Sequence, residues 1–325
     1  MQSVEEMHGA SRVVDVCVGV QADETVVVAT DWRCSEVGER IAAAAKQRGA
    51  EVILTVMTPR EHDGNEPPEP VKAAMLEADV VITPVTRSVT HSTVMPEAME
   101  RGARFISMVG FTPEQLVTGG LYADYESMRP MCERMAEKFS EASEARVTSP
   151  QGTDVTVGLE GRPGNAHPGI ATEPGTHTGL VHIESNIAPK EGTTNGTVVF
   201  DGAIPNLGIG ELDEDVVMEI EDGYVTDVAG GKAAKRIEQV WAEYDVPAVY
   251  NIAQLAVGMN PECEEFNDWF SHNHGRYGNV HFGIGTSTNL GGETRAPVHF
   301  DAMMAEATLK LDGETVLEGG SEFQV

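Results

Sequence analysis

Four short apolar runs in the first 110 residues constrain the fold of this chain more than any other feature. The runs are 26–30 (VVVAT), 51–57 (EVILTVM), 79–84 (DVVITP) and 104–109 (RFISMV). A strand with one face in water alternates apolar and polar residues, so runs without alternation predict strands covered on both faces. Helical patterns at 35–48, 71–77 and 90–102 separate the runs. The alternation predicts an α/β fold, a doubly wound parallel sheet, for the N-terminal part.

The character of the sequence changes near residue 145. From there the chain is rich in Gly, Thr, Val and Asp, and short strand patterns are separated by turns such as 151–152 and 312–313. These features predict an α+β, mostly antiparallel C-terminal domain. The length of 325 residues also fits two domains. We therefore expect a Rossmann-like domain at 1–144 and an α+β metal-binding catalytic domain at 145–325.

The charge of the chain excludes some partners. A net charge of −30 disfavours nucleic acid and anionic membrane surfaces as partners. Such an acidic composition favours a halophilic protein, whose fold or activity needs salt, over a merely acidic cytosolic one. No apolar run approaches the length of a membrane span, and the N-terminus lacks the pattern of a signal peptide. We expect a cytoplasmic protein.

The four cysteines are far apart in the sequence. They are Cys17, Cys34, Cys132 and Cys263, and no two form a C-x-x-C pair. This spacing predicts neither a disulfide framework nor a zinc–cysteine site.

The stretch 278–301 carries the candidate site. It holds His281, His299 and Asp301, with four glycines between the two histidines. Residues two apart in a strand point to the same side, so His299 and Asp301 are expected to face one space. Two imidazoles and a carboxylate suit zinc, iron or manganese. The spacing alone leaves open the alternative that these histidines are ordinary core residues, and the glycines predict a loop that approaches a ligand closely.

Two other groups of polar residues carry weaker signals of a functional site. His272 and His274 lie beside Asn273 and Gly275, which predicts an exposed pair without a ligating role. The segment 85–92 follows the third apolar run; its residues are expected to cap a helix, and the alternative is a substrate contact through Arg87 or His91.

Six segments of the second domain occur in an order that resembles the aminopeptidase T family of metallopeptidases. They are 149–156 (SPQGTDVT), 182–202 (HIESNIAPKEGTTNGTVVFDG), 219–231 (EIEDGYVTDVAGG), 251–261 (NIAQLAVGMNP), 278–285 (GNVHFGIG) and 299–301 (HFD). The same segments resemble equally the related iron-dependent dioxygenases that open dihydroxypyridine rings. The first domain fits through 78–125, so the resemblance covers nearly the whole chain. It implies a two-domain fold, a homodimer and a metal site in the second domain.

The resemblance also implies a ligand set. Glu184 stands where the aminopeptidases carry a metal-binding Glu, and His281 matches one of their metal-binding histidines. His299 and Asp301 match the closing H-x-D that both branches use. Two neutral imidazoles and two carboxylates would give a neutral site around one divalent ion.

Two positions depart from the aminopeptidase pattern. Gln254 stands where the aminopeptidases have a second Glu and the dioxygenases an iron-binding His, and Thr288 replaces a Tyr. Gln254 is expected to hydrogen-bond the substrate or a metal-bound water. Glu191, seven residues beyond Glu184, is either a general base or a turn carboxylate.

Three functions follow from these features. Our main expectation is a metal-dependent hydrolase that uses Zn, Mn or Co to activate water on an amide or peptide-like bond, because the four-donor set belongs to that branch. The alternatives are a non-haem Fe(II) ring-cleaving dioxygenase and a non-catalytic metal or small-molecule binding protein. We expect a small-molecule or peptide substrate. We also expect a homodimer that includes the Met-bearing helix 122–143.

Overall fold

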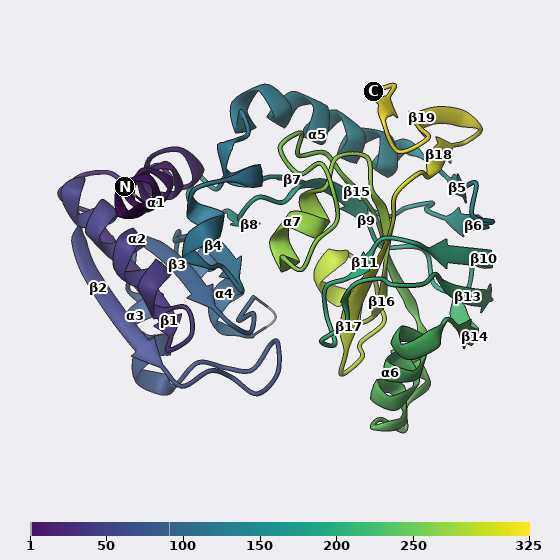
Figure 1. Cartoon of the computed structure of the whole chain (residues 1–325), viewed down its shortest axis with the longest axis horizontal. Helices are drawn as coiled ribbons and strands as arrows, with labels where there is room; N and C mark the ends of the chain where they lie inside the picture. The colour runs from purple at the N-terminus through teal and green to yellow at the C-terminus, as the bar shows by residue number, and fades with distance from the viewer. Residues whose placement is uncertain (1, 91) are drawn as a thin grey trace. The chain divides into compact units, whose positions relative to one another are not determined.

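The computed structural model describes residues 2–90 and 92–325, which form two compact units. Unit 1 contains the chain up to Tyr125 together with Gly169–His182, and unit 2 contains Glu126–Pro168 and Ile183–Val325. The expected fold class is confirmed, because unit 1 holds a parallel sheet and unit 2 holds antiparallel sheets (Figure 1).

Unit 1 is built on a five-stranded parallel sheet in the order β2-β1-β3-β4-β8. Its strands are β1 Thr25–Asp31, β2 Glu51–Met57, β3 Val80–Val85, β4 Arg104–Val109 and β8 His177–Gly179. Its helices are α1 Gln2–Arg12, α2 Ser35–Gln47, α3 Glu69–Leu76 and α4 Val94–Glu100, with a π-helix at Val13–Cys17 and 3-10 turns at Pro113–Leu116 and Gly119–Tyr122. All four strands predicted from the apolar runs are present.

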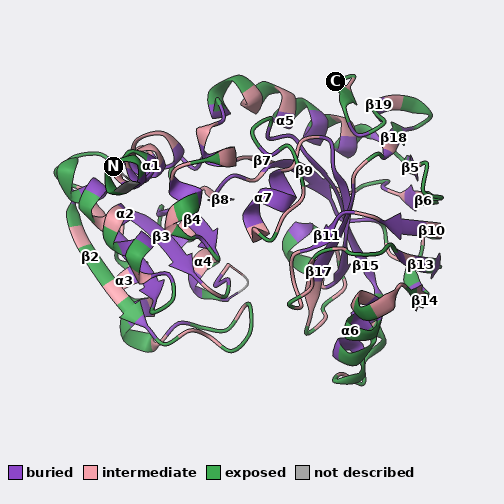
Figure 2. Ribbon diagram, viewed as in Figure 1, coloured by how far each residue is buried: buried purple, intermediate pink, exposed green. Residues whose placement is uncertain are grey.

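The second of these strands is not buried as its composition predicts. Every residue of β3 and β4 is buried, but β2 lies at the sheet edge, with Ile53 40% and Val56 48% exposed (Figure 2). Composition cannot distinguish an edge strand from a central one, because strand order is decided by pairing across the sheet.

The helix expected at 90–102 begins instead at Val94. Arg87, considered for substrate contact, lies 3.7 Å from Asp63. His91, the other candidate for that contact, lies outside the described residues.

The expected division at residues 144–145 stays a prediction about domains. The compact units divide near Tyr125, so most of helix α5 (Tyr125–Glu141) belongs to unit 2. The chain later returns to unit 1, because β8 pairs in parallel with β4. A long-range pairing of this kind leaves no local signal in the sequence.

Unit 2 contains two large antiparallel sheets. The first has eight strands in the order β14-β13-β10-β6-β5-β18-β19-β20, and the second has five in the order β17-β16-β15-β9-β7. The eight are β5 Glu144–Thr148, β6 Asp154–Gly158, β10 Asn195–Phe200, β13 Val216–Glu221, β14 Tyr224–Ala229, β18 Thr308–Leu311, β19 Glu314–Glu318 and β20 Glu322–Phe323. The five are β7 Gly164–Pro168, β9 Ile183–Ile187, β15 Ile252–Gly258, β16 Val280–Gly285 and β17 His299–Met304. Smaller elements are β11 Ala203–Ile204, β12 Gly210–Glu211, α6 Gly231–Ala242, α7 Phe270–Gly275, and 3-10 turns at Pro247–Tyr250 and Thr288–Leu290.

The three central strands of the five-stranded sheet are fully buried. Every residue of β9, β15 and β16 is buried, and these strands are purple throughout in Figure 2. One face carries apolar side chains such as Phe282 and Phe300, both fully buried. Polar residues on the other face must therefore find partners within the protein.

Two further expectations concern the whole chain. All four cysteines are buried, and none is joined in a disulfide among the described residues. Burial raises the pKa of Cys17 and of Cys132 to about 12. No helix of the described residues combines the length and apolar composition that crossing a bilayer requires.

The contrast between β1 and its edge neighbour β2 can be tested with one substitution at two sites. Val27→Ala, in fully buried β1, should lower the free energy of unfolding by about 2–3 kcal/mol, because it leaves a cavity. Val56→Ala, on the exposed edge, should change it by less than about 1 kcal/mol. Urea denaturation measures both, and equal losses would contradict the assigned strand order.

Candidate metal centre

Strand register places five predicted functional side chains on one face of the five-stranded sheet. Gly283 pairs with both Gln254 and Asp301, so the side chains of Gln254 and Asp301 share a face. His299 pairs with Gly285, two residues beyond Gly283, and so lies on that face too. His281 pairs with Ala256, and Glu184 pairs with Gly258. Ala256 and Gly258 lie two and four residues beyond Gln254 in the same strand, so His281 and Glu184 are on that face as well.

Small residues on the same face make room for this group. Ala256, Gly258, Gly283 and Gly285 alternate with the functional positions along β15 and β16. A Cβ atom on Gly283 would come within 2.8 Å of both the Gln254 Cβ and the His299 Cε1. Gly283 and Gly285 thus lie in a strand, not in the predicted ligand loop, and they accommodate neighbouring side chains.

The four predicted metal ligands lie in two close pairs. His299 Nε2 is 3.3 Å from Asp301 Oδ1, and His281 Nε2 is 3.7 Å from Glu184 Oε2. All four side chains are at most 10% exposed. These histidines face carboxylates, which favours the metal-ligand expectation over the alternative of ordinary core residues.

His274 also belongs to this cluster, although the sequence predicted an exposed residue. It is 5% exposed, and its Nε2 lies 3.2 Å from Asp301 Oδ2. Its ring meets that of His281 edge to face, with centroids 5.5 Å apart. His272 is buried as well, but its Nε2 lies 3.1 Å from the Glu265 carbonyl. The four histidines within residues 272–299 are the sequence signal from which a place for His274 in the site could have been predicted.

The three clustered imidazoles have the same orientation. Their Nδ1 atoms face oxygen acceptors: the Phe270 carbonyl at 2.9 Å from His274, the Asn279 Oδ1 at 2.8 Å from His281, and the Thr286 carbonyl at 2.7 Å from His299. An Nδ1 that donates to oxygen leaves the lone pair of a neutral ring on Nε2. The Nε2 atoms of His274 and His299 therefore turn a potential metal-binding lone pair toward Asp301.

Burial and nearby charges shift the pKa values of the cluster members in opposite directions. Burial raises the pKa of Glu184 to about 6 and lowers the pKa of His281 to about 3. Burial also lowers the pKa of His274 and His299, but the nearby Asp301 outweighs it and leaves both raised. The same two imidazoles hold the pKa of Asp301 well below its usual value, against the effect of burial.

The cluster fits a divalent cation on the chemistry of its donors. The described residues contain no group of three or more His, Cys, Asp or Glu whose present geometry could hold a metal ion. Yet Glu184 Oε2 and Asp301 Oδ1 are buried without a hydrogen-bond partner, although three imidazole nitrogens are nearby. We give this more weight, because unpaired buried carboxylate oxygens are costly unless a cation satisfies them.

The two predicted catalytic residues have different surroundings. Gln254 lies in the cluster, with its Nε2 3.5 Å from His281 Nε2. Glu191 is paired with Arg162 and accepts a hydrogen bond from the Glu293 backbone N–H at 2.7 Å. Because both contacts stabilise the local chain conformation, the geometry favours the turn-carboxylate alternative for Glu191.

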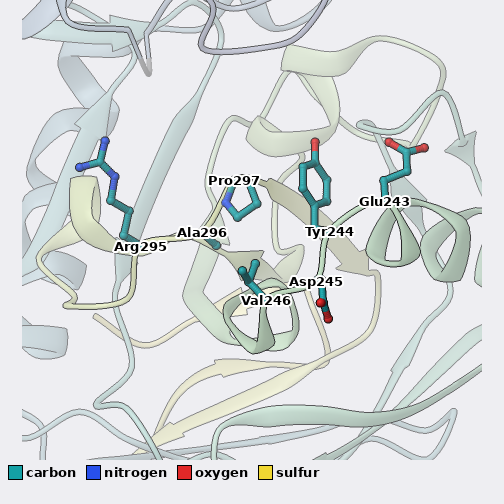
Figure 3. Close-up of a pocket in the computed structure, with 7 residues that line it drawn as sticks. All are labelled: Glu243, Tyr244, Asp245, Val246, Arg295, Ala296 and Pro297. Carbon is teal, nitrogen blue, oxygen red and sulfur yellow. The ribbon is translucent and has the colours of Figure 1, made fainter.

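A separate pocket of about 620 Å³ opens on unit 2. It is lined by two segments, Glu243–Val246 and Arg295–Pro297 (Figure 3). None of the clustered histidines or carboxylates lines it, so we do not assign it to the site.

Comparison with known proteins finds dioxygenases by sequence, and both a dioxygenase and an AmpT by structure. The family model described as NicX, 2,5-dihydroxypyridine 5,6-dioxygenase, matches residues 7–324. A 2,5-dihydroxypyridine 5,6-dioxygenase from Pseudomonas putida KT2440 is 26% identical over 259 residues, covering 76% of this chain and 71% of that protein. A solved structure of 2,5-dihydroxypyridine dioxygenase from the same organism has a TM-score of 0.84 at 21% identity and covers 98% of this chain and 97% of that one. Wild-type AmpT from Thermus thermophilus has a TM-score of 0.75 at 14% identity, with both chains fully covered.

The raised pKa of Glu184 predicts an unusual pH dependence for the metal-free protein. A carboxyl whose pKa rises from 4.5 to about 6 on folding stabilises the fold only below its unfolded pKa, and that contribution is lost as the pH rises through 6. Glu184→Gln should therefore unfold like the wild type at pH 4.5 but be about 2 kcal/mol more stable at pH 7.5. Urea denaturation in excess chelator measures the difference, and a destabilised variant at pH 7.5 would contradict it.

The close approach at Gly283 predicts a steric effect on the site. Gly283→Ala should push the His299 ring aside and weaken Co(II) binding at least about tenfold, with a loss of about 1–3 kcal/mol in stability. Gly38→Ala is the matched control, because its Cβ would also crowd a neighbour, Thr30, at 2.9 Å but in unit 1. Metal titration of both variants tests this, and an equal loss of affinity in both would refute it.

Proposed function

Because the chain belongs to the 2,5-dihydroxypyridine 5,6-dioxygenase family, whose model matches residues 7–324, we propose that it is a non-haem Fe(II) dioxygenase acting on a dihydroxylated pyridine ring. The observation that carries the proposal is the pairing of His299 with Asp301, two donors of a two-histidine, one-carboxylate iron site. The family match supports an enzyme over the non-catalytic alternative.

The expected hydrolase is wrong. The family model and the relative from Pseudomonas putida both describe a dioxygenase, whereas the likeness to AmpT, at 14% identity, shows the fold alone. We therefore propose neither a zinc-activated water nor a peptide-like substrate for this protein. The sequence could not distinguish the two chemistries, because both use the closing H-x-D.

The proposed cofactor is Fe(II), with His299 and Asp301 among its ligands. When bound, Fe(II) supplies sites at which oxygen and a chelating substrate can be activated together. The predicted partners Glu184 and His281 lie against this pair on the same face of the sheet. Glu184 Oε2, which is buried without a hydrogen-bond partner, would be available to accept a proton from a ring hydroxyl.

The proposed reaction balances without an added reductant. Cleavage of the bond between ring carbons 5 and 6 places one oxygen atom on each carbon, so that carbon 5 becomes a carboxylate and carbon 6 an N-formyl group. Both oxygen atoms come from O₂, which is reduced by the electrons of the broken bond. The chain contributes the buried face, which limits water, and the Gln254 amide, which can donate a hydrogen bond to the substrate.

Oxygen uptake tests the proposal. Protein loaded anaerobically with Fe(II) should consume one O₂ for each 2,5-dihydroxypyridine lost, and Asp301→Asn should slow this at least about 100-fold. Asp154→Asn is the matched control, because that carboxylate is exposed and paired with Arg146 in a different sheet. Hydrolysis of aminoacyl amides by the zinc-loaded protein, without oxygen uptake in any form, would overturn the proposal.

A further inference from the structure

We infer that His274, and not His281, supplies the second imidazole of the metal site, so that His274, His299 and Asp301 form the ligand set. The inference rests on the proposed function for the presence of a metal. It assigns the ligands from the contacts of this chain alone.

The first argument is the position of Asp301 between two imidazoles. Its Oδ2 lies 3.2 Å from His274 Nε2, and its Oδ1 lies 3.3 Å from His299 Nε2. Two donors about 2.1 Å from one ion lie about 3.0 Å apart at an octahedral angle and about 3.4 Å apart at a tetrahedral angle. Both distances fall in that range. The distance of 3.7 Å from His281 Nε2 to Glu184 Oε2 lies outside it, so these two side chains are not both placed to bind one ion.

The second argument is that both nitrogens of His281 have other partners. Its Nδ1 donates to Asn279 Oδ1, and the Asn279 amide nitrogen donates to the His274 and Arg276 carbonyls at 3.0 and 2.7 Å, which fixes the direction of Oδ1. The His281 Nε2 lone pair therefore faces the Gln254 Nε2, a hydrogen-bond donor, at 3.5 Å. A lone pair that accepts from an amide is not available to a metal.

The third argument is that the His274 ring is held in place. Its Nδ1 bonds the Phe270 carbonyl at the start of the same short helix, and its ring packs on the Phe270 ring at 4.7 Å. Asn279 also anchors the end of α7 through the His274 carbonyl. Such contacts from surrounding groups orient the ligating histidines of metal sites.

A competing role for His274 is that of a protonated partner that only orients Asp301. The two roles differ in the number of imidazoles bound to the metal. If His274 is a ligand, two imidazoles bind the metal, and replacing His274 lowers the number to one. If His274 only orients Asp301, replacing it leaves the number of bound imidazoles unchanged.

Pulsed EPR of the Cu(II)-loaded full chain counts coordinated imidazoles directly. We expect two in the wild type, one in His274→Gln and two in His281→Gln. Co(II) affinity should fall at least about 100-fold in His274→Gln and less than about tenfold in His281→Gln. His281→Gln is the control for His274→Gln, because it makes the same substitution at a neighbouring ring.

The other outcomes distinguish a failure of the ligand assignment from a failure of the proposed function. Two imidazoles in His274→Gln, or one in His281→Gln, would overturn the ligand assignment and leave the proposed function intact. A wild type without imidazole-bound metal would overturn both. The expected counts without oxygen uptake would uphold the ligands and reject the dioxygenase. If His274→Gln fails to fold, proton–nitrogen correlation spectra of the zinc-loaded wild type identify the metal-bound Nε2 atoms without any substitution.

Discussion

A buried carboxylate, Asp301, is the constraint on which the rest of the site depends. It stays ionised, because the imidazoles of His274 and His299 lower its pKa against the effect of burial. Moving such a charge out of water costs several kcal/mol, so its partners must be held at close range. The sheet does this for His299, which is two residues away on the same strand. Helix α7 does it for His274, which lies 27 residues upstream.

The glycine-rich segment after β16 is fastened to the same site by polar contacts. The Thr286 carbonyl accepts from His299 Nδ1, and the Leu290 carbonyl accepts from Asn165. Asn165 also bonds Asn186, which in turn donates to Glu184 Oε1 at 3.0 Å. The orientation of Glu184 is thus connected through two asparagines to the segment over the site, and the Arg162–Glu191 ion pair holds the far end of that segment. Glu191 therefore has a structural role in positioning this segment.

Most residues of the cluster could be found from the sequence, but His274 and the chemistry of the site could not. The H-x-D spacing in a strand places two donors on one side, which requires only the alternation of a strand. The same donors serve hydrolysis and oxygenation, and only the match to a family of dioxygenases distinguished them. The expected homodimer, the halophilic character and the cytoplasmic location stay predictions.

What the sequence determined by itself were the local properties of the chain: the four parallel strands of unit 1, the antiparallel character of unit 2, and the pairing of His299 with Asp301. These follow from side-chain periodicity within a few residues. Tertiary structure alone decided that β2 lies at an exposed edge and that β8 joins a distant sheet. It also decided that His274 is buried beside Asp301. Those outcomes depend on pairing and packing between residues far apart in the chain, and no local pattern records which distant segments will meet.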